Sequence, residues 1–335
     1  MRTTIRLRRG NKFGRKIVAL LVLPGAVAIT TAVPDMVSAA VRLSPEAATA
    51  KIQSLLDHPV NGSVSLPSGT FTIRPSLRLS QGEQILGHNT TLKVASGSGD
   101  YAVVLSGQTP QTNLSGLRIS GITFDQNSAG NPVKATSALF KGQPRFVILA
   151  SAGSDIAVTG NRLTGIDNVD SIVTGSATSD VTISNNVLKS SNPLGHDMSS
   201  IYTSGSQTTI TNNTLTGQSM FGAAAIEVHG TGVTVSGNRV SGYPRGVNVV
   251  ASHTSLTGNA ITGALNPVDL WSVNAPSLSD VRVIGNRLGR NLKFWKSVYH
   301  AHGRPLPAAK YTGMVIRDEA STFGFNMIVV SGNKG

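Results

Sequence analysis

Ionisable and aromatic side chains recur at equivalent positions of a repeated segment between residues 167 and 271. Each repeat contains one aliphatic position that can be aligned with the others: Ile172, Ile201, Ile226, Val247 and Leu270. Alternate residues of a strand point to opposite faces, so the next residue in each repeat is expected to face solvent. That outward column contains Val173, Tyr202, Glu227, Asn248 and Trp271, and the column before the aliphatic contains Ser171, Ser200, Ala225, Gly246 and Asp269. His229 follows Glu227 on the same face, ~7 Å along the strand.

The bends that lead into these strands add further reactive groups. Carboxylates, imidazoles, a guanidinium and exposed aromatic rings gather on this strip, and a glutamate is uncommon on a strand surface. We therefore predict the functional site here. The catalytic candidates are Glu227, His229, Arg245, Asp197 and His196. The substrate-binding candidates are Tyr202, Asn248, Trp271, Asp269 and Tyr243.

Two kinds of polysaccharide cleavage fit these residues. A lyase needs a base and a cation that neutralises the substrate carboxylate; Arg245 or His229 would be the base, and Ca²⁺ held by Asp167 and Asp170 the cation. The spacing of these two aspartates does not by itself specify calcium. A hydrolase needs two carboxyl groups ~5–5.5 Å or ~6.5–9.5 Å apart. Glu227 and Asp197 lie on adjacent repeats and fit either distance, whereas Asp269 is a whole turn further away.

A non-catalytic interpretation is the alternative to both. Glu227 with His229 would then be a solvated surface pair, and Arg245 would bond to a turn carbonyl. Tyr202 and Trp271 would pack under a loop or form a stacking platform for sugars, and His196 with Asp197 would cap a turn. The strip would be a carbohydrate-binding groove or an adhesion surface. We favour an enzyme, because a binding surface rarely needs acid, imidazole and guanidinium groups together.

A repeat of about 25 residues positions these side chains. One four-residue pattern recurs six times: glycine or asparagine, then asparagine, then any residue, then an aliphatic residue. The asparagines at its second position are separated by 25, 27, 25, 21 and 27 residues, and they are Asn161, Asn186, Asn213, Asn238, Asn259 and Asn286. Period-2 alternation of Val, Ile and Leu within each repeat indicates strands. Strands of successive turns would stack ~4.7–4.9 Å apart, so the asparagines would form a hydrogen-bonded ladder at a bend where asparagine tolerates the left-handed conformation. We interpret this ladder as structural.

This repeat resembles one turn of a right-handed parallel β-helix, as in the pectate-lyase-like superfamily. The resemblance extends from Gly62 to the C-terminus, and the stretches SLPSGTFTI, LRL and QILGHNTTL near residues 65–92 resemble the first turns of that fold. It implies an all-β chain that winds as a single parallel β-helix. The superfamily's catalytic signatures are not intact, since Gly195-His196-Asp197 matches only two residues of a Gly-His-Gly element. The resemblance therefore does not imply pectin as the substrate.

Composition and the two ends of the chain complete the prediction. Residues 1–39 hold +6 of the net charge of +13, and they have the basic, apolar and small-residue parts of a secretory signal. Residues 40–61 are predicted to contain a capping helix, with an apolar stripe of Ala48, Ile52, Leu55 and Leu56, and residues 62–335 the β-helix. The polar stretch 125–143 and the irregular stretch 291–307 interrupt the repeat. The absence of cysteine excludes disulfides and thiolate chemistry.

These observations lead to one prediction of function. We expect a secreted monomer that cleaves an extracellular polysaccharide in a groove along one face of the β-helix, as a lyase or a glycoside hydrolase. The moderately basic chain favours an acidic polymer. We expect no nucleic acid partner, no membrane association after removal of the signal, and no cofactor other than Ca²⁺.

Overall fold

A computed structural model describes residues 43–74, 76–98, 105–107, 109, 112–132, 146–271, 278–306, 310–312, 316–319 and 325–335. The described residues belong to one compact unit, Leu43–Gly335. The predicted secretory signal of residues 1–39 lies outside the described residues, as does the section 133–143 of the predicted loop. No helix in the described ranges has the length and apolar character needed to span a membrane.

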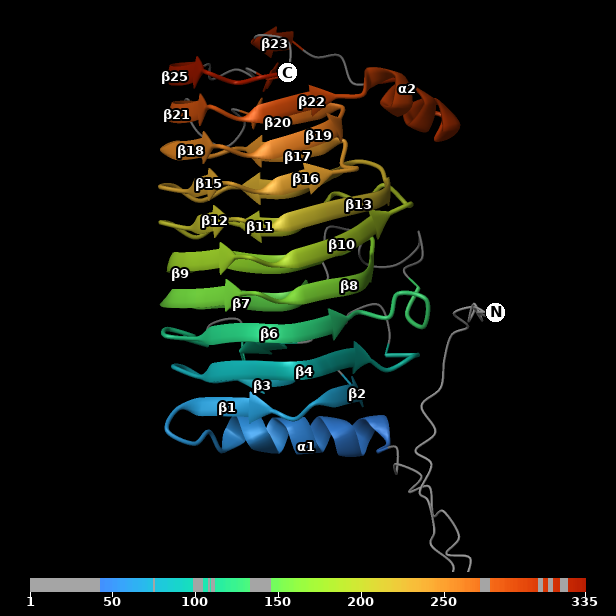
Figure 1. Cartoon of the computed structure of the whole chain (residues 1–335), viewed down its shortest axis with the longest axis vertical. Helices are drawn as coiled ribbons and strands as arrows, with labels where there is room; N and C mark the ends of the chain where they lie inside the picture. Colours follow the sequence, from blue (N-terminus) through green and yellow to red (C-terminus); the bar gives the residue numbers. More distant parts are fainter. Residues whose placement is uncertain are drawn as a thin grey trace, which may run out of the picture. The chain divides into compact units, whose positions relative to one another are not determined.

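The chain winds as a parallel β-helix, in which each strand pairs with the equivalent strand one turn later (Figure 1). Three faces surround one core. The long strands β4 (Gln84–Val94), β6 (Arg118–Asp125), β7 (Phe146–Thr159) and β9 (Asp170–Ser184) bend at a corner and contribute to two faces each. This is the all-β architecture that the repeat predicted.

The other strands belong to one face each. The first face, which leads to the asparagine ladder, contains β1 (Ser63–Leu66), β12 (Thr209–Thr211), β15 (Thr234–Ser236), β18 (Thr254–Thr257), β21 (Leu278–Ile284) and β25 (Phe325–Ser331). The second contains β2 (Gly69–Ile73), β8 (Arg162–Asp167), β10 (Val187–Asn192), β13 (Thr214–Met220), β16 (Arg239–Ser241), β19 (Ala260–Ala264) and β22 (Arg287–Arg290). The third contains β3 (Leu77–Leu79), β5 (Leu105–Gly107), β11 (Met198–Thr203), β14 (Ala223–Val228), β17 (Arg245–Val249), β20 (Asn266–Trp271) and β24 (Ile316–Glu319), with β23 (Lys310–Thr312) antiparallel to β24.

The core consists of stacked aliphatic side chains at the inward positions of each face. On the third face Ile172, Ile201, Ile226 and Val247 pair in register, and all four are fully buried. Burying each such side chain contributes about 1.5–3 kcal/mol. Stacking identical positions is therefore what stabilises a turn that could not bury its apolar residues alone.

The asparagine ladder is confirmed. Asn186 Nδ2 donates to Asn213 Oδ1 at 3.0 Å, and Asn213 Nδ2 donates to Asn238 Oδ1 at 3.0 Å. The ladder continues to Asn333, whose Oδ1 accepts a hydrogen bond from Asn286 Nδ2. The prediction of the left-handed residue was wrong by one position: φ is +56° at Asn185 and +64° at Gly160, each immediately before a ladder asparagine.

A helix covers the first turn of the coil. Helix α1 (Pro45–Asp57) begins at the N-cap Ser44, whose hydroxyl accepts a hydrogen bond from the Ala47 N–H, and it buries Ala48, Ile52 and Leu56. It packs on β1, β2 and β3, as the sequence predicted, although Leu55 is only partly buried (Figure 1). The helix thereby covers the unpaired edge of the first turn.

The segment predicted to be irregular near the other end contains a helix. Helix α2 (Leu292–Ala301) begins after Asn291, whose side chain accepts a hydrogen bond from the Phe294 N–H. Trp295 is buried and donates its indole N–H to the Gly263 carbonyl, so α2 is anchored to the side of the coil. Val330 on β25, the last strand of the first face, remains 37% exposed.

Candidate functional site

The register of the third face corrects the predicted outward column. Tyr202 pairs with Glu227, and Glu227 with Asn248, as predicted. Asn248 then pairs with Asp269 rather than with Trp271, because Leu270 aligns with Val249. The aliphatic alignment was therefore wrong by two residues at this turn. A shift of two residues preserves the inward and outward pattern of a strand, so alternation alone cannot detect it.

The column before each aliphatic does not face solvent. Ser171, Ser200 and Ala225 are fully buried, and a Cβ on Gly246 would lie 2.5 Å from the Ile261 side chain in the core. The Ser200 hydroxyl lies 2.7 Å from the Tyr243 hydroxyl. The third face therefore bends at this position, and two consecutive residues point inward.

Tyr243 is placed in the core and not on a substrate-binding surface. Its side chain is fully buried, and burial raises the pKa of its hydroxyl to about 12. The hydroxyl is thus a neutral hydrogen-bonding group of the interior. Its pairing with Ser200 explains how a polar atom is accommodated in an aliphatic core.

Glu227 is the centre of a hydrogen-bonded cluster on the third face. Its side chain is only 8% exposed, and the Ser199 hydroxyl donates to Oε2 at 2.5 Å. Its Oε1 lies 2.9 Å from His229 Nε2 and accepts a bond from Asn248 Nδ2 at 3.2 Å. Burial raises the pKa of Glu227, but the bonds from His229 and Ser199 and the charge of Arg245 outweigh it and lower the pKa overall. Glu227 is therefore ionised at neutral pH.

Asp170 is a second buried carboxyl group, connected to Glu227 through Ser199. Its Oδ1 accepts a hydrogen bond from the Ser199 N–H at 2.5 Å. Burial, together with the negative charges of Glu227 and Asp197, raises the pKa of Asp170 to about 8 despite that bond. Asp170 is thus protonated at neutral pH while Glu227 is ionised.

Three half-buried or exposed side chains border this cluster. The Tyr202 ring lies 4.9 Å from the His229 ring, and burial, with the charges of Glu227 and Asp170, raises the pKa of its hydroxyl. The carboxylate of Asp197 is 89% exposed and lies 3.5 Å from Arg245 Nη2. Arg245 also donates to the Gly222 carbonyl at 2.9 Å, which is the bond expected if its role is structural.

The remaining predicted residues lie elsewhere or are enclosed. His196 is buried in a turn, where its backbone N–H and carbonyl both bond to the Asn192 side chain. Asp269 is buried at the next turn after Asn248, and Trp271, half-buried, pairs with Glu319. Neither Asp269 nor Trp271 touches the Glu227 cluster through any hydrogen bond of the described residues.

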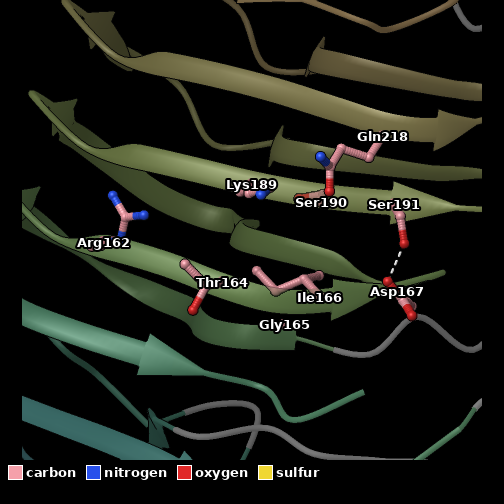
Figure 2. Close-up of a pocket in the computed structure, with 9 residues that line it drawn as sticks. All are labelled: Arg162, Thr164, Gly165, Ile166, Asp167, Lys189, Ser190, Ser191 and Gln218. Atoms are coloured by element: carbon pink, nitrogen blue, oxygen red, sulfur yellow. Dashed lines mark hydrogen bonds between the residues drawn. The ribbon is translucent and has the colours of Figure 1, made fainter. Parts of the chain in front are cut away.

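The two aspartates proposed as calcium ligands face different surroundings. Asp167 lines a hollow of about 290 Å³ on the second face, beside Arg162 and Lys189, and accepts a hydrogen bond from the Ser191 hydroxyl (Figure 2). Asp170 belongs to the third face. Within the described ranges, no group of three or more histidine or carboxylate side chains is arranged to hold a metal ion. The predicted calcium pair is therefore not brought together.

A cleft lies directly beside the cluster. It has a volume of about 440 Å³ and shares His229 with the Glu227 network. It lies where the third-face strands β11, β14 and β17 end and the chain bends toward the first face. Its lining consists mostly of hydroxyl-bearing and small residues: Ser176, Ser204, Ser206, His229, Gly230, Thr231, Val250, Ala251 and Ser252.

Sequence reasoning missed Ser199 and the role of Asp170. Ser199 lies three residues before Tyr202, and in a regular strand two residues three apart point to opposite faces. Both can point outward only because the strand bends between them. The bend at Ser200 directs the Ser199 hydroxyl toward Glu227, although Ser199 itself is buried. An unusual run of two serines before the aliphatic position was the available signal, and one sequence does not reveal its meaning.

Comparisons with known proteins identify the fold. No family model matches the chain, and no curated protein sequence matches it. Among solved structures, a tailspike protein variant of E. coli bacteriophage HK620 aligns with a TM-score of 0.66 and 17% identity, over 88% of this chain and 54% of that one. The same phage's tailspike in complex with a pentasaccharide aligns with a TM-score of 0.61 and 18% identity, over 85% and 52%.

These matches show that the chain has the right-handed parallel β-helix fold of the tailspike proteins. The chain spans about half the length of the tailspike proteins that it matches. Some of the tailspike structures carry a glutamate-to-glutamine replacement, or replacements of an aspartate and a glutamate, together with a bound oligosaccharide. At this identity the likeness concerns the fold alone.

Proposed function

We propose that the chain is a glycoside hydrolase that cleaves an extracellular polysaccharide on its third face, with Asp170 and Glu227 as the carboxyl pair. One observation carries the proposal: Ser199 binds both carboxyl groups, and their pKa values are driven in opposite directions. Glycoside hydrolysis needs one protonated and one ionised carboxyl group at the same pH. Two groups that bond to the same serine are close enough to act as a pair, and their separation, ~5–5.5 Å for retention or ~6.5–9.5 Å for inversion, would decide the stereochemical course.

Each residue then has a defined role. Asp170, neutral at pH 7, donates a proton to the oxygen of the leaving sugar. Glu227, ionised, acts as nucleophile or activates water, and Ser199, His229 and Asn248 orient its oxygens. Tyr202 offers a flat ring beside His229 for contact with the sugar.

The lyase alternative fits the charges less well. A lyase must neutralise the carboxylate next to the proton that it removes. Glu227 itself is ionised, and the Arg245 guanidinium already contacts Asp197 and the Gly222 carbonyl. A uronate carboxylate there would lie close to the ionised Glu227, which disfavours its binding.

The tailspike proteins support a polysaccharide as the substrate, because their structures include bound pentasaccharide and hexasaccharide. Export of this chain by residues 1–39 is part of the proposal, since an extracellular polymer requires it. The sequence's expectation of a monomer remains a prediction.

Release of reducing ends from a panel of polysaccharides tests the proposal. Glu227→Gln and Asp170→Asn should each reduce kcat by about 10²–10⁴-fold, while Asp197→Asn, at an exposed carboxylate, serves as the matched control. Products that absorb in the ultraviolet would indicate elimination and refute the hydrolase. Glycan binding without any cleavage would indicate the non-catalytic alternative. If Asp197→Asn abolished activity and Asp170→Asn did not, the pair would be Glu227 with Asp197.

A further inference from the structure

The cleft beside His229 has a lining that specifies the chemistry of what it holds. We propose that it is a subsite for an uncharged sugar unit, neutral or N-acetylated, adjacent to the bond that is cleaved. This inference rests on the proposed function for its position relative to the reaction. The lining itself, however, is an independent observation.

The hydroxyl groups of the cleft are available to a ligand. Among the described residues, the side chains of Ser176 and Ser206 form no hydrogen bond with the protein, and both line the cleft. Ser204 donates to the Thr174 carbonyl at 3.1 Å, which leaves its oxygen free to accept. A hydroxyl can both donate and accept, and so can the hydroxyl and acetamido groups of a sugar. The lining therefore matches a sugar edge without imposing a charge.

The cleft lacks the groups that a charged sugar would need. None of its nine lining residues is aspartate, glutamate, lysine or arginine, and its single imidazole is already bonded to Glu227 through Nε2. A uronate or sulfate there would lose water without gaining a cation, and would lie near the ionised Glu227. The charged pair of Asp197 and Arg245 lies at the opposite end of the strands, since β17 begins at Arg245 and the cleft residue Val250 follows its end.

The apolar part of the lining suits the carbon face of a pyranose. Val250 and Ala251 lie beside the serines, and the ring of Tyr202 lies next to His229. Ligand sites commonly combine an apolar wall with a few placed polar groups, in pockets of ~300–1,000 Å³. The volume of about 440 Å³ falls in that range. The cleft thus changes the expectation drawn from net charge: the unit next to the carboxyl pair is not acidic.

Binding of the Glu227→Gln protein to an array of neutral, N-acetylated and uronate glycans tests the inference, because that variant retains the cleft and should not cleave. Retained glycans are expected to contain an uncharged unit. Ser206→Asp introduces a carboxylate into the cleft and should weaken binding of the best glycan at least tenfold. Ser65→Asp, at an exposed serine of β1, is the matched control and should leave binding unchanged.

Three outcomes would overturn the inference: retention only of glycans in which every unit is charged, retention of no glycan, or unchanged affinity after Ser206→Asp. These outcomes differ from failure of the proposed function. Cleavage by the native protein combined with retention of homopolyuronates alone would leave the hydrolase standing and remove the uncharged subsite. Selective retention of uncharged glycans without cleavage by the native protein would support the uncharged subsite and refute the hydrolase.

Discussion

Replacing Asp170 with asparagine should make the protein more stable at neutral pH while removing its activity. The carboxyl group is buried, and its pKa is raised from 3.8 to about 8 in the folded state. Asparagine keeps an oxygen that can accept the Ser199 N–H bond, but it cannot ionise. The variant therefore tests whether Asp170 is held neutral at an energetic cost.

The magnitude follows from the linkage between proton binding and folding. The stabilising contribution of a carboxyl group with a raised pKa is fully present below the unfolded value near 3.8 and decreases as pH rises toward about 8. The decrease is about 1.4 kcal/mol per pH unit for one proton. At pH 7 this is at most about 4 kcal/mol, so Asp170→Asn should gain up to that amount there and little at pH 4.

Urea or guanidinium unfolding of the native protein and of Asp170→Asn, measured at several pH values between 4 and 8, gives the difference in the free energy of unfolding. The difference should increase with pH up to about 8 and then level off. Asp197→Asn, at an exposed carboxylate, should stay within about 0.5 kcal/mol at every pH. A difference for Asp170→Asn that does not depend on pH would refute the assignment of a neutral Asp170, and with it the proposed proton donor.

Three further predictions concern the same site and the ladder. The pH profile of kcat/KM should decline on the alkaline side near pH 8, as Asp170 loses its proton, and on the acid side only below the usual range of a glutamate, because the pKa of Glu227 is lowered; an alkaline limb absent up to pH 10 would contradict this. His229→Ala removes a hydrogen bond that lowers the pKa of Glu227, so the acid limb of that profile should move to higher pH; an unmoved limb would show that the bond has no such effect. Asn213→Ala should reduce the free energy of unfolding by about 2–6 kcal/mol, because the Asn186 N–H and the Ile183 carbonyl lose buried partners. Asn333→Ala, at the partly exposed end of the ladder, should cost less in the same denaturation experiment.

The repeat predicted the coil because its signal is local. Each ladder asparagine is accompanied by aliphatic residues at fixed offsets, and a period near 25 residues leaves few architectures other than a β-helix. The stacking of Asn186, Asn213 and Asn238, the capping helix α1, and the shared face of Tyr202, Glu227 and Asn248 were all predicted from these offsets.

The errors have a common physical origin. Turns differ in length, and a strand pattern is unchanged by a shift of two residues, so Trp271 was aligned where Asp269 lies. A bend that turns two consecutive residues inward places the Ser200 side chain in the core and the Ser199 hydroxyl, also buried, against Glu227, although alternation predicts otherwise. The helix α2 depends on Trp295 packing against a distant turn, which local composition does not reveal.

By itself, the sequence determined that the chain winds as a coil and that Glu227 shares one strand face with His229, because strand periodicity and repeat spacing are properties of neighbouring residues. It did not reveal that Glu227 is buried there. Only the tertiary structure decided that Asp170, Ser199 and Glu227 meet, and that one carboxyl group is neutral while the other is charged. The pKa of a carboxyl group depends on burial and on the groups that surround it, and here those groups come from turns that are more than twenty residues apart in the chain.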